Sequence, residues 1–81
     1  MKVIVNCYEE KGDFLRDTPD YAEVYDSITE ALRDKRKVIR KCRKTGDFIG
    51  FRIYDTLGEL KHKLASETVT NKSIILRQMA S

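Results

Sequence analysis

The chain has 81 residues, of which 36% are charged and 41% hydrophobic, and its formal net charge is +3 at pH 7. A chain of this length supports a single domain and buries only about 60–65% of the surface that its unfolded form exposes, so we expect one small core under a heavily charged surface. The first apolar run is shorter than the core of a signal peptide and far shorter than a membrane span, which predicts a cytoplasmic protein that does not enter a membrane.

The residues that usually carry metal or redox chemistry are few, namely Cys7, Cys42 and His62. A structural zinc site usually takes four such ligands, so we expect no metal and no other cofactor. The two cysteines are far apart in sequence, and free thiols in a reducing cytoplasm are favoured over a disulfide. Because no pair of nucleophile and base can be proposed, the sequence predicts a protein that is not an enzyme.

The N-terminal third of the chain predicts short strands separated by turns. Lys2–Tyr8 is rich in β-branched residues and apolar on both faces, which is typical of a central strand. Turns are expected at Glu9–Asp13 and Asp17–Asp20, which contain glycine and proline. Phe14–Arg16 and Tyr21–Tyr25 are predicted strand segments, and the second is expected to return against the first strand of the chain.

A helix is expected to begin at Ser27, because Ser27–Glu30 has the sequence of a capping box. Its end is open to two interpretations. The favoured helix covers about residues 27–36, since the β-branched pair Val38–Ile39 is followed by alternating basic and apolar residues. Lys37–Lys44 is then a strand that enters a hairpin at Thr45–Asp47. The alternative helix continues to Lys44 and stops at Gly46, because Val38, Ile39 and Cys42 continue a stripe with the 3.6-residue period.

The C-terminal half of the chain predicts a hairpin and one further strand. Phe48–Asp55 alternates apolar and polar residues, and after a turn at Thr56–Glu59 the chain returns as Leu60–Leu64. Ala65–Lys72 is expected to be a loop, and Ser73–Met79 a last strand. The predicted fold is therefore a small α+β domain, with one helix packed on an antiparallel sheet of four or five strands.

Charge is distributed unevenly along the chain. Residues 1–30 contain three basic and eight acidic side chains, whereas residues 31–81 contain thirteen basic and five acidic ones. Arg33–Lys44 alone holds eight of the sixteen basic residues and a single acid, Asp34. On either a helix or a strand these side chains are expected to face outward, within reach of a phosphate backbone. The simpler alternative is a solvated surface that balances the acidic N-terminal third.

The basic run is the strongest functional signal, and we expect it to bind nucleic acid or a nucleoprotein through phosphate contacts rather than base reading. Two further candidates, Arg52 and Tyr54, share one face of the strand Phe48–Asp55. They could extend this surface, because exposed aromatic rings beside positive charge stack on bases. The predicted binding residues are Arg36, Lys37, Arg40, Lys41, Arg43, Lys44, Arg52 and Tyr54.

Cys42, inside the basic run, and His62, on the strand Leu60–Leu64, also need an interpretation. Cys42 lies among cations that would make an exposed thiol more reactive, but a structural role is favoured. His62 is expected to be half-buried or on the surface. The alternative function is a protein–protein interaction module, such as a phage-type inhibitor or regulator of a larger host machine. The opposite charges of the two ends of the chain also suit self-association as a homodimer.

Overall fold

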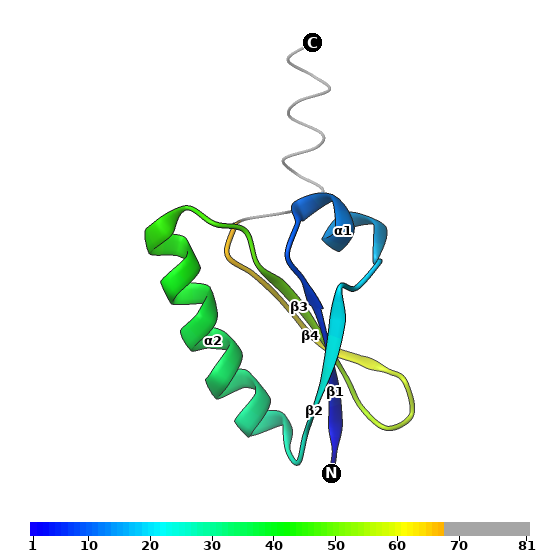
Figure 1. The fold of residues 1–81 in the computed structure, drawn as a ribbon. Coiled ribbons are helices and arrows are strands. Elements are labelled where there is room, and N and C mark those ends of the chain that lie inside the picture. The colour runs from blue at the N-terminus through cyan, green and yellow to red at the C-terminus, as the bar shows by residue number, and fades with distance from the viewer. Residues whose placement is uncertain (68–81) are drawn as a thin grey trace, which may run out of the picture.

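The computed structural model describes residues 1–67, and Figure 1 shows their fold. The elements follow in the order β1 (Val3–Tyr8), α1 (Lys11–Arg16), β2 (Tyr21–Tyr25), α2 (Ile28–Thr45), β3 (Gly50–Tyr54) and β4 (Leu60–Ala65). The strands form one sheet in the order β2-β1-β3-β4, and each neighbouring pair is antiparallel. The expected α+β fold, one main helix on an antiparallel sheet, is confirmed, and the strand expected at Ser73–Met79 lies outside the described residues.

The central position of β1 follows from its two apolar faces. Ile4 is paired with Val24 of β2 on one side and with Tyr54 of β3 on the other. Successive side chains of a strand alternate between the faces of the sheet. Val3 and Val5 therefore point toward α2, where they are 3% and 0% exposed, whereas Ile4 lies on the opposite face and is 44% exposed. We call this opposite side the open face of the sheet.

The core lies between α2 and the other face of the sheet. Its buried cluster consists of Val3, Val5, Cys7, Ala31, Ile39, Ile49, Phe51 and Ile53. In Figure 1, α2 crosses this face as a layer of its own, and α1 lies at one end of the sheet. Neither of the two helices within residues 1–67 has both the length and the apolar composition needed to cross a membrane.

The capping motif places the start of α2 correctly. The Ser27 hydroxyl accepts a hydrogen bond from the Glu30 amide at 3.2 Å, which satisfies one of the amide groups that a helix leaves unpaired at its N-terminus. At the other end, Gly46 has a φ of 80°, and its amide donates to the Cys42 carbonyl. Glycine adopts this left-handed conformation without the steric cost of a β-carbon, so the helix ends there.

The favoured prediction that this helix ends near Arg36 is wrong, and the longer alternative is correct. Ile39 is 5% exposed and Cys42 packs against the core, so both continue the stripe that begins with Ala31. The intrinsic helix propensity of a β-branched residue is lower than that of alanine by only a few tenths of a kcal/mol, whereas burying one large apolar side chain contributes about 1.5–3 kcal/mol. Packing against the sheet therefore outweighs the local preference for a strand.

The prediction of a turn at Glu9–Asp13 followed by a strand at Phe14–Arg16 is also wrong. These residues form the short helix α1, whose Phe14 is 1% exposed. The ring of Phe14 packs edge-on against Tyr8, with 5.3 Å between the ring centroids. A short helix is stable here because it carries one aromatic side chain into contact with the sheet, a tertiary contact that local sequence does not show.

Gly50 permits the close approach of α1 to the sheet. A β-carbon at this position would lie 2.5 Å from Cδ1 of Phe14. Gly50→Ala is therefore expected to displace Phe14 and to lower the free energy of unfolding by about 1–3 kcal/mol, as overpacking of a core does. Urea denaturation measures this change.

Gly12→Ala is the matched control, because Gly12 lies within α1 and its added β-carbon would meet only the flexible Arg16 side chain, at 3.3 Å. This variant is expected to be as stable as the wild type or more stable by about 0.5 kcal/mol. Equal stability of the two variants would contradict the close contact between Gly50 and Phe14.

Candidate nucleic-acid interface

Helix α2 has one side in the core and the other in solvent. With 3.6 residues per turn, six of its seven exposed cations fall on the side that faces away from the sheet, and the seventh is Arg43. The six are Arg33, Arg36, Lys37, Arg40, Lys41 and Lys44. We call these six residues the basic face. The helix is about 27 Å long at 1.5 Å per residue, so the basic face forms an extended ridge.

The cations of the basic face have no carboxylate partner among residues 1–67. The ion pairs of this part of the chain are Lys11–Glu67, Arg16–Asp13, Lys35–Glu23, Arg52–Asp17, Lys61–Asp55 and Lys61–Glu59. Of the acids in residues 1–30, Asp13, Glu23 and Asp17 pair with other basic residues, and none pairs with the basic face. The simpler explanation of the basic run was a balance of charge within the molecule. No ion pair between the basic face and an acid of residues 1–67 supports it.

Neighbouring cations of the basic face repel one another. The pairs separated by four residues are Arg33–Lys37, Arg36–Arg40, Lys37–Lys41 and Arg40–Lys44. A like-charge pair at this spacing destabilises a helix by about 0.2–0.5 kcal/mol. The free protein therefore retains an unfavourable interaction that a bound polyanion would relieve.

A surface hollow of about 350 Å³ lies along the basic face. Its lining consists of Thr29, Leu32, Arg33, Arg36, Lys37 and Arg40. Four cationic groups surround this hollow, while Leu32 also packs against the core. An anion in the hollow would be within reach of cations on successive turns of the helix.

Arg43 and Lys35 belong to the same basic run, but each is bonded within the fold. The Arg43 guanidinium donates through Nε to the Ser66 carbonyl at 3.3 Å, so it links α2 to the chain after β4. Lys35 is 6% exposed and points toward the sheet, which contradicts the expectation that every cation of the run faces outward. Its position between Ala31 and Ile39 on the apolar stripe is the sequence signal that would have placed it there.

Lys35 forms an ion pair with Glu23 of β2, with 2.5 Å between Nζ and Oε1. Its ammonium also lies 4.9 Å from the ring centroid of Phe51. The hydrogen bond from Lys35 lowers the pKa of the Glu23 carboxyl, against the opposing effect of burial. Burial would lower the pKa of the Lys35 ammonium, but hydrogen bonds to Glu23 and Tyr25 outweigh it, so this pKa is raised. Both groups are thus charged at neutral pH.

Glu23→Gln is expected to lower the free energy of unfolding at pH 7, by an amount that becomes smaller as the pH falls below 4.5. The folded pKa of Glu23 lies below the ordinary value of 4.5, so the stabilisation is present above pH 4.5 and is lost as the pH falls through the folded pKa. Urea denaturation across this pH range measures it, with the exposed Glu9→Gln as the control. A constant difference between the wild type and Glu23→Gln from pH 7 to pH 3 would contradict the ion pair.

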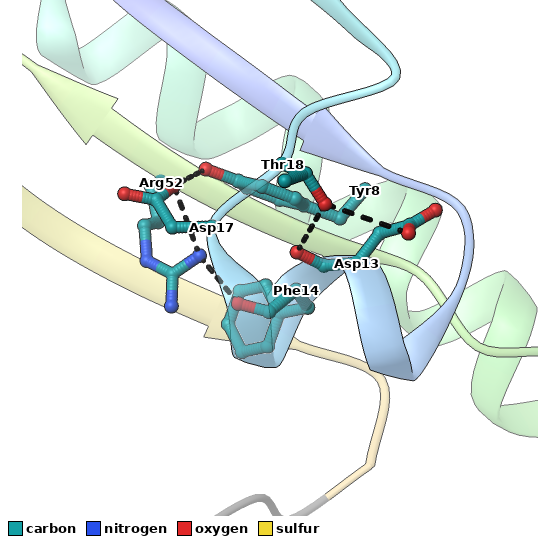
Figure 2. Close-up of polar contacts among 6 residues, drawn as sticks. All are labelled: Tyr8, Asp13, Phe14, Asp17, Thr18 and Arg52. Atoms are coloured by element: carbon teal, nitrogen blue, oxygen red, sulfur yellow. Dashed lines mark hydrogen bonds and ion pairs between the residues drawn. The ribbon is translucent and has the colours of Figure 1, made fainter.

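Arg52, one of the predicted binding residues, lies on the open face and is separated from the basic face by the sheet. Figure 2 shows its guanidinium beside Asp17 and Phe14. Nη1 donates to the Phe14 carbonyl at 2.7 Å, and the guanidinium carbon lies 4.3 Å from the centroid of the Phe14 ring. Asp17 accepts hydrogen bonds from Arg52 and from the Tyr8 hydroxyl. Arg52 therefore holds α1 against the sheet and does not extend the basic face.

Tyr54 also lies on the open face, in a row of apolar residues that crosses all four strands. The register pairs Val24 with Ile4, Ile4 with Tyr54, and Tyr54 with Leu60. Val24, Ile4 and Leu60 are 65%, 44% and 45% exposed. We call these four residues the apolar row. Sequence alternation predicted that Tyr54 shares a face with Arg52, but the row depends on the strand order and could not be read from the chain.

The two cysteines are free thiols with different surroundings. Cys7 is completely buried, and this burial raises the pKa of its thiol to about 12, so it stays protonated at neutral pH. Cys42 is partly buried and packs from α2 against the core. His62 is partly buried opposite Ile53 in the sheet. The positions of Cys42 and His62 agree with the structural interpretation given to each.

Comparison of the chain with protein-family models, with curated proteins and with solved structures gave no match. The function is therefore inferred from the geometry of the surfaces described above.

Proposed function

We propose that this protein binds nucleic acid through the basic face of α2, by contacts with phosphate groups rather than by reading bases. One observation carries the proposal: six cations on a single helical face have no carboxylate partner in the part of the chain that the structure describes. A phosphate backbone supplies regularly spaced negative charges along such a ridge, and each neutralised phosphate releases condensed counterions.

The number of cations sets an expected salt dependence. For B-DNA the slope of the logarithm of the binding constant against the logarithm of the salt concentration is about −0.9 for each phosphate neutralised. If all six residues of the basic face make one contact each, the expected slope is about −5. Binding of this kind is strong at low salt and weakens steeply toward physiological salt.

Substitution of four basic-face residues by glutamine tests the proposal. The variant is R36Q/R40Q/K41Q/K44Q, which spares Arg43 because that residue bonds to Ser66. We expect an affinity loss of at least about 100-fold at low salt and a slope that is shallower by about 3.6. Fluorescence polarisation with labelled oligonucleotides measures both quantities. The thermal stability should stay the same or rise slightly, because like-charge repulsion is removed.

The matched control removes four charges from other parts of the surface, in the variant K2Q/K11Q/K61Q/K63Q. Its net charge equals that of the basic-face variant, so a difference in affinity between the two reports the position of the charges. We expect the control to keep an affinity within a few-fold of the wild type, since distant charges act only through a screened field. Similar losses in both variants, or no loss in either, would contradict a binding site on α2.

The apolar row favours a second candidate function, the binding of a protein partner on the open face. Exposed apolar side chains that adjoin one another across strands are typical of interaction surfaces. Asp20 and Asp26, at the two ends of β2, are exposed and take part in no ion pair within residues 1–67. The partner that fits this face therefore has an apolar surface bordered by basic residues.

Val24→Glu is expected to abolish the capture of such a partner from cell extract and to leave the affinity for nucleic acid within a few-fold of the wild type. Val24 is 65% exposed, so the substitution should not disturb the core. Leu15→Glu, at a 52% exposed position of α1, is the control for placing an acid on an apolar surface residue. Equal capture by the wild type and both variants would exclude the apolar row as a docking surface.

A further inference from the structure

Helix α2 has no neighbouring helix beside it within residues 1–67. It is the helix that packs on the core face of the sheet in residues 1–67, and α1 contacts β1 and β3 from the open face. An α-helix with its side chains is about 10–12 Å across, and the major groove of B-DNA is about 12 Å wide. The solvent side of α2 can thus approach the floor of a groove without obstruction by a neighbouring helix of the described residues.

The cations of the basic face are spread around the helix as well as along it. At 100° per residue, Arg33, Lys37, Arg40 and Lys44 lie on the side opposite the buried stripe and form the crest of the ridge. Arg36 lies on one flank and Lys41 on the other, about 140° apart around the helix axis. A single line of phosphates would engage one flank only. Cations on both flanks match the two phosphate walls of a groove.

The composition of α2 argues against two other kinds of nucleic acid. Single strands are usually held by aromatic rings that stack on bases, and Ile28–Thr45 contains no aromatic residue. Duplex RNA has a major groove too narrow for a helix and is recognised through its 2′-hydroxyl groups and phosphates. From Arg33 to Lys44 the exposed polar side chains are Arg, Lys and Asp34 alone, without the amides and hydroxyls that suit a 2′-hydroxyl group.

The geometry points to duplex DNA as the nucleic acid that the basic face binds, with α2 lying in the major groove; this inference rests on the proposed function. The flanks, Arg36 and Lys41, contact phosphates of the two strands. At the crest, Arg33 and Arg40 face the groove floor two turns apart, where guanine O6 and N7 are the acceptors that arginine meets most often. These crest contacts add to the phosphate contacts that supply most of the affinity.

Three matched probes distinguish this inference from the proposed function. The full chain is titrated by fluorescence polarisation against duplex DNA, duplex RNA and single-stranded DNA of one sequence, each about 20 nucleotides long and so longer than the roughly 27 Å that α2 covers. We expect the duplex DNA to bind at least 10-fold more tightly than the other two. Equal affinity for all three, or a preference for RNA or for the single strand, overturns the inference and leaves the proposed function standing. Binding to none of them at low salt overturns both.

A second titration tests whether α2 lies in the major groove. Bulky substituents on pyrimidine C5 project into the major groove, and a minor-groove ligand occupies the other one. We expect the substituted duplex to bind at least 10-fold more weakly than the plain duplex, and the minor-groove ligand to change the affinity less than 2-fold. The opposite pattern, or equal affinity for the plain and substituted duplexes, overturns docking in the major groove.

The crest is tested by combining this modification with the variant R33Q/R40Q. On the plain duplex the variant is expected to bind at least 10-fold more weakly than the control K2Q/K63Q, which loses the same charge away from α2. On the substituted duplex the two variants should have the same affinity, because the bulky substituents keep Arg33 and Arg40 from reaching the floor of the major groove. An equal loss from R33Q/R40Q on both duplexes would overturn the placement of the crest.

Discussion

The packing of α2 on the sheet brings together residues from both ends of the described chain. Ala31 and Ile39 of the helix share one buried cluster with Val5 of β1 and Phe51 of β3. Because the buried positions repeat with the helical period, the positions between them must face water. The core thus fixes which cations of Arg33–Lys44 form a surface, and the character of that surface follows from the orientation of the helix.

Two groups of cations among the described residues differ in their surroundings. Lys35 and Arg52 are largely buried beside aromatic rings, and each has a carboxylate partner, Glu23 or Asp17. A charge withdrawn from water is costly unless it is paired, so these two carry partners within the fold. The cations of the basic face stay in water and carry no partner among the described residues. The first group stabilises the fold, and the second is available to bind a ligand.

The features that the sequence predicted correctly are those with a local physical cause. The Ser27 cap depends on residues three apart, and the alternation in Phe48–Asp55 follows from the geometry of a strand. The features that it predicted wrongly depend on contacts between distant residues. The full length of α2 requires the sheet beneath Ile39, and α1 requires Gly50 to admit the ring of Phe14.

The candidate site was predictable to a similar extent. The basic run and most members of the basic face were evident in the sequence, but the orientations of Lys35 and Arg52 were not predicted. Lys35 faces inward because it lies on the apolar stripe of α2 one turn after Ala31, whereas the cations of the run were all expected to face outward. Arg52 is separated from the basic face because strand alternation places it opposite the core, where α1 covers it.

The uncompensated charge of α2 has a consequence for the lifetime of the protein in a cell. A ligand that binds only the folded chain stabilises it by about 2.7 kcal/mol when its free concentration is 100 times the dissociation constant. The open states that proteases attack would then become roughly 100-fold rarer. If the protein binds a polyanion as proposed, molecules in excess of that polyanion would keep their internal repulsion and be degraded first, so turnover would match the amount of protein to the amount of polyanion.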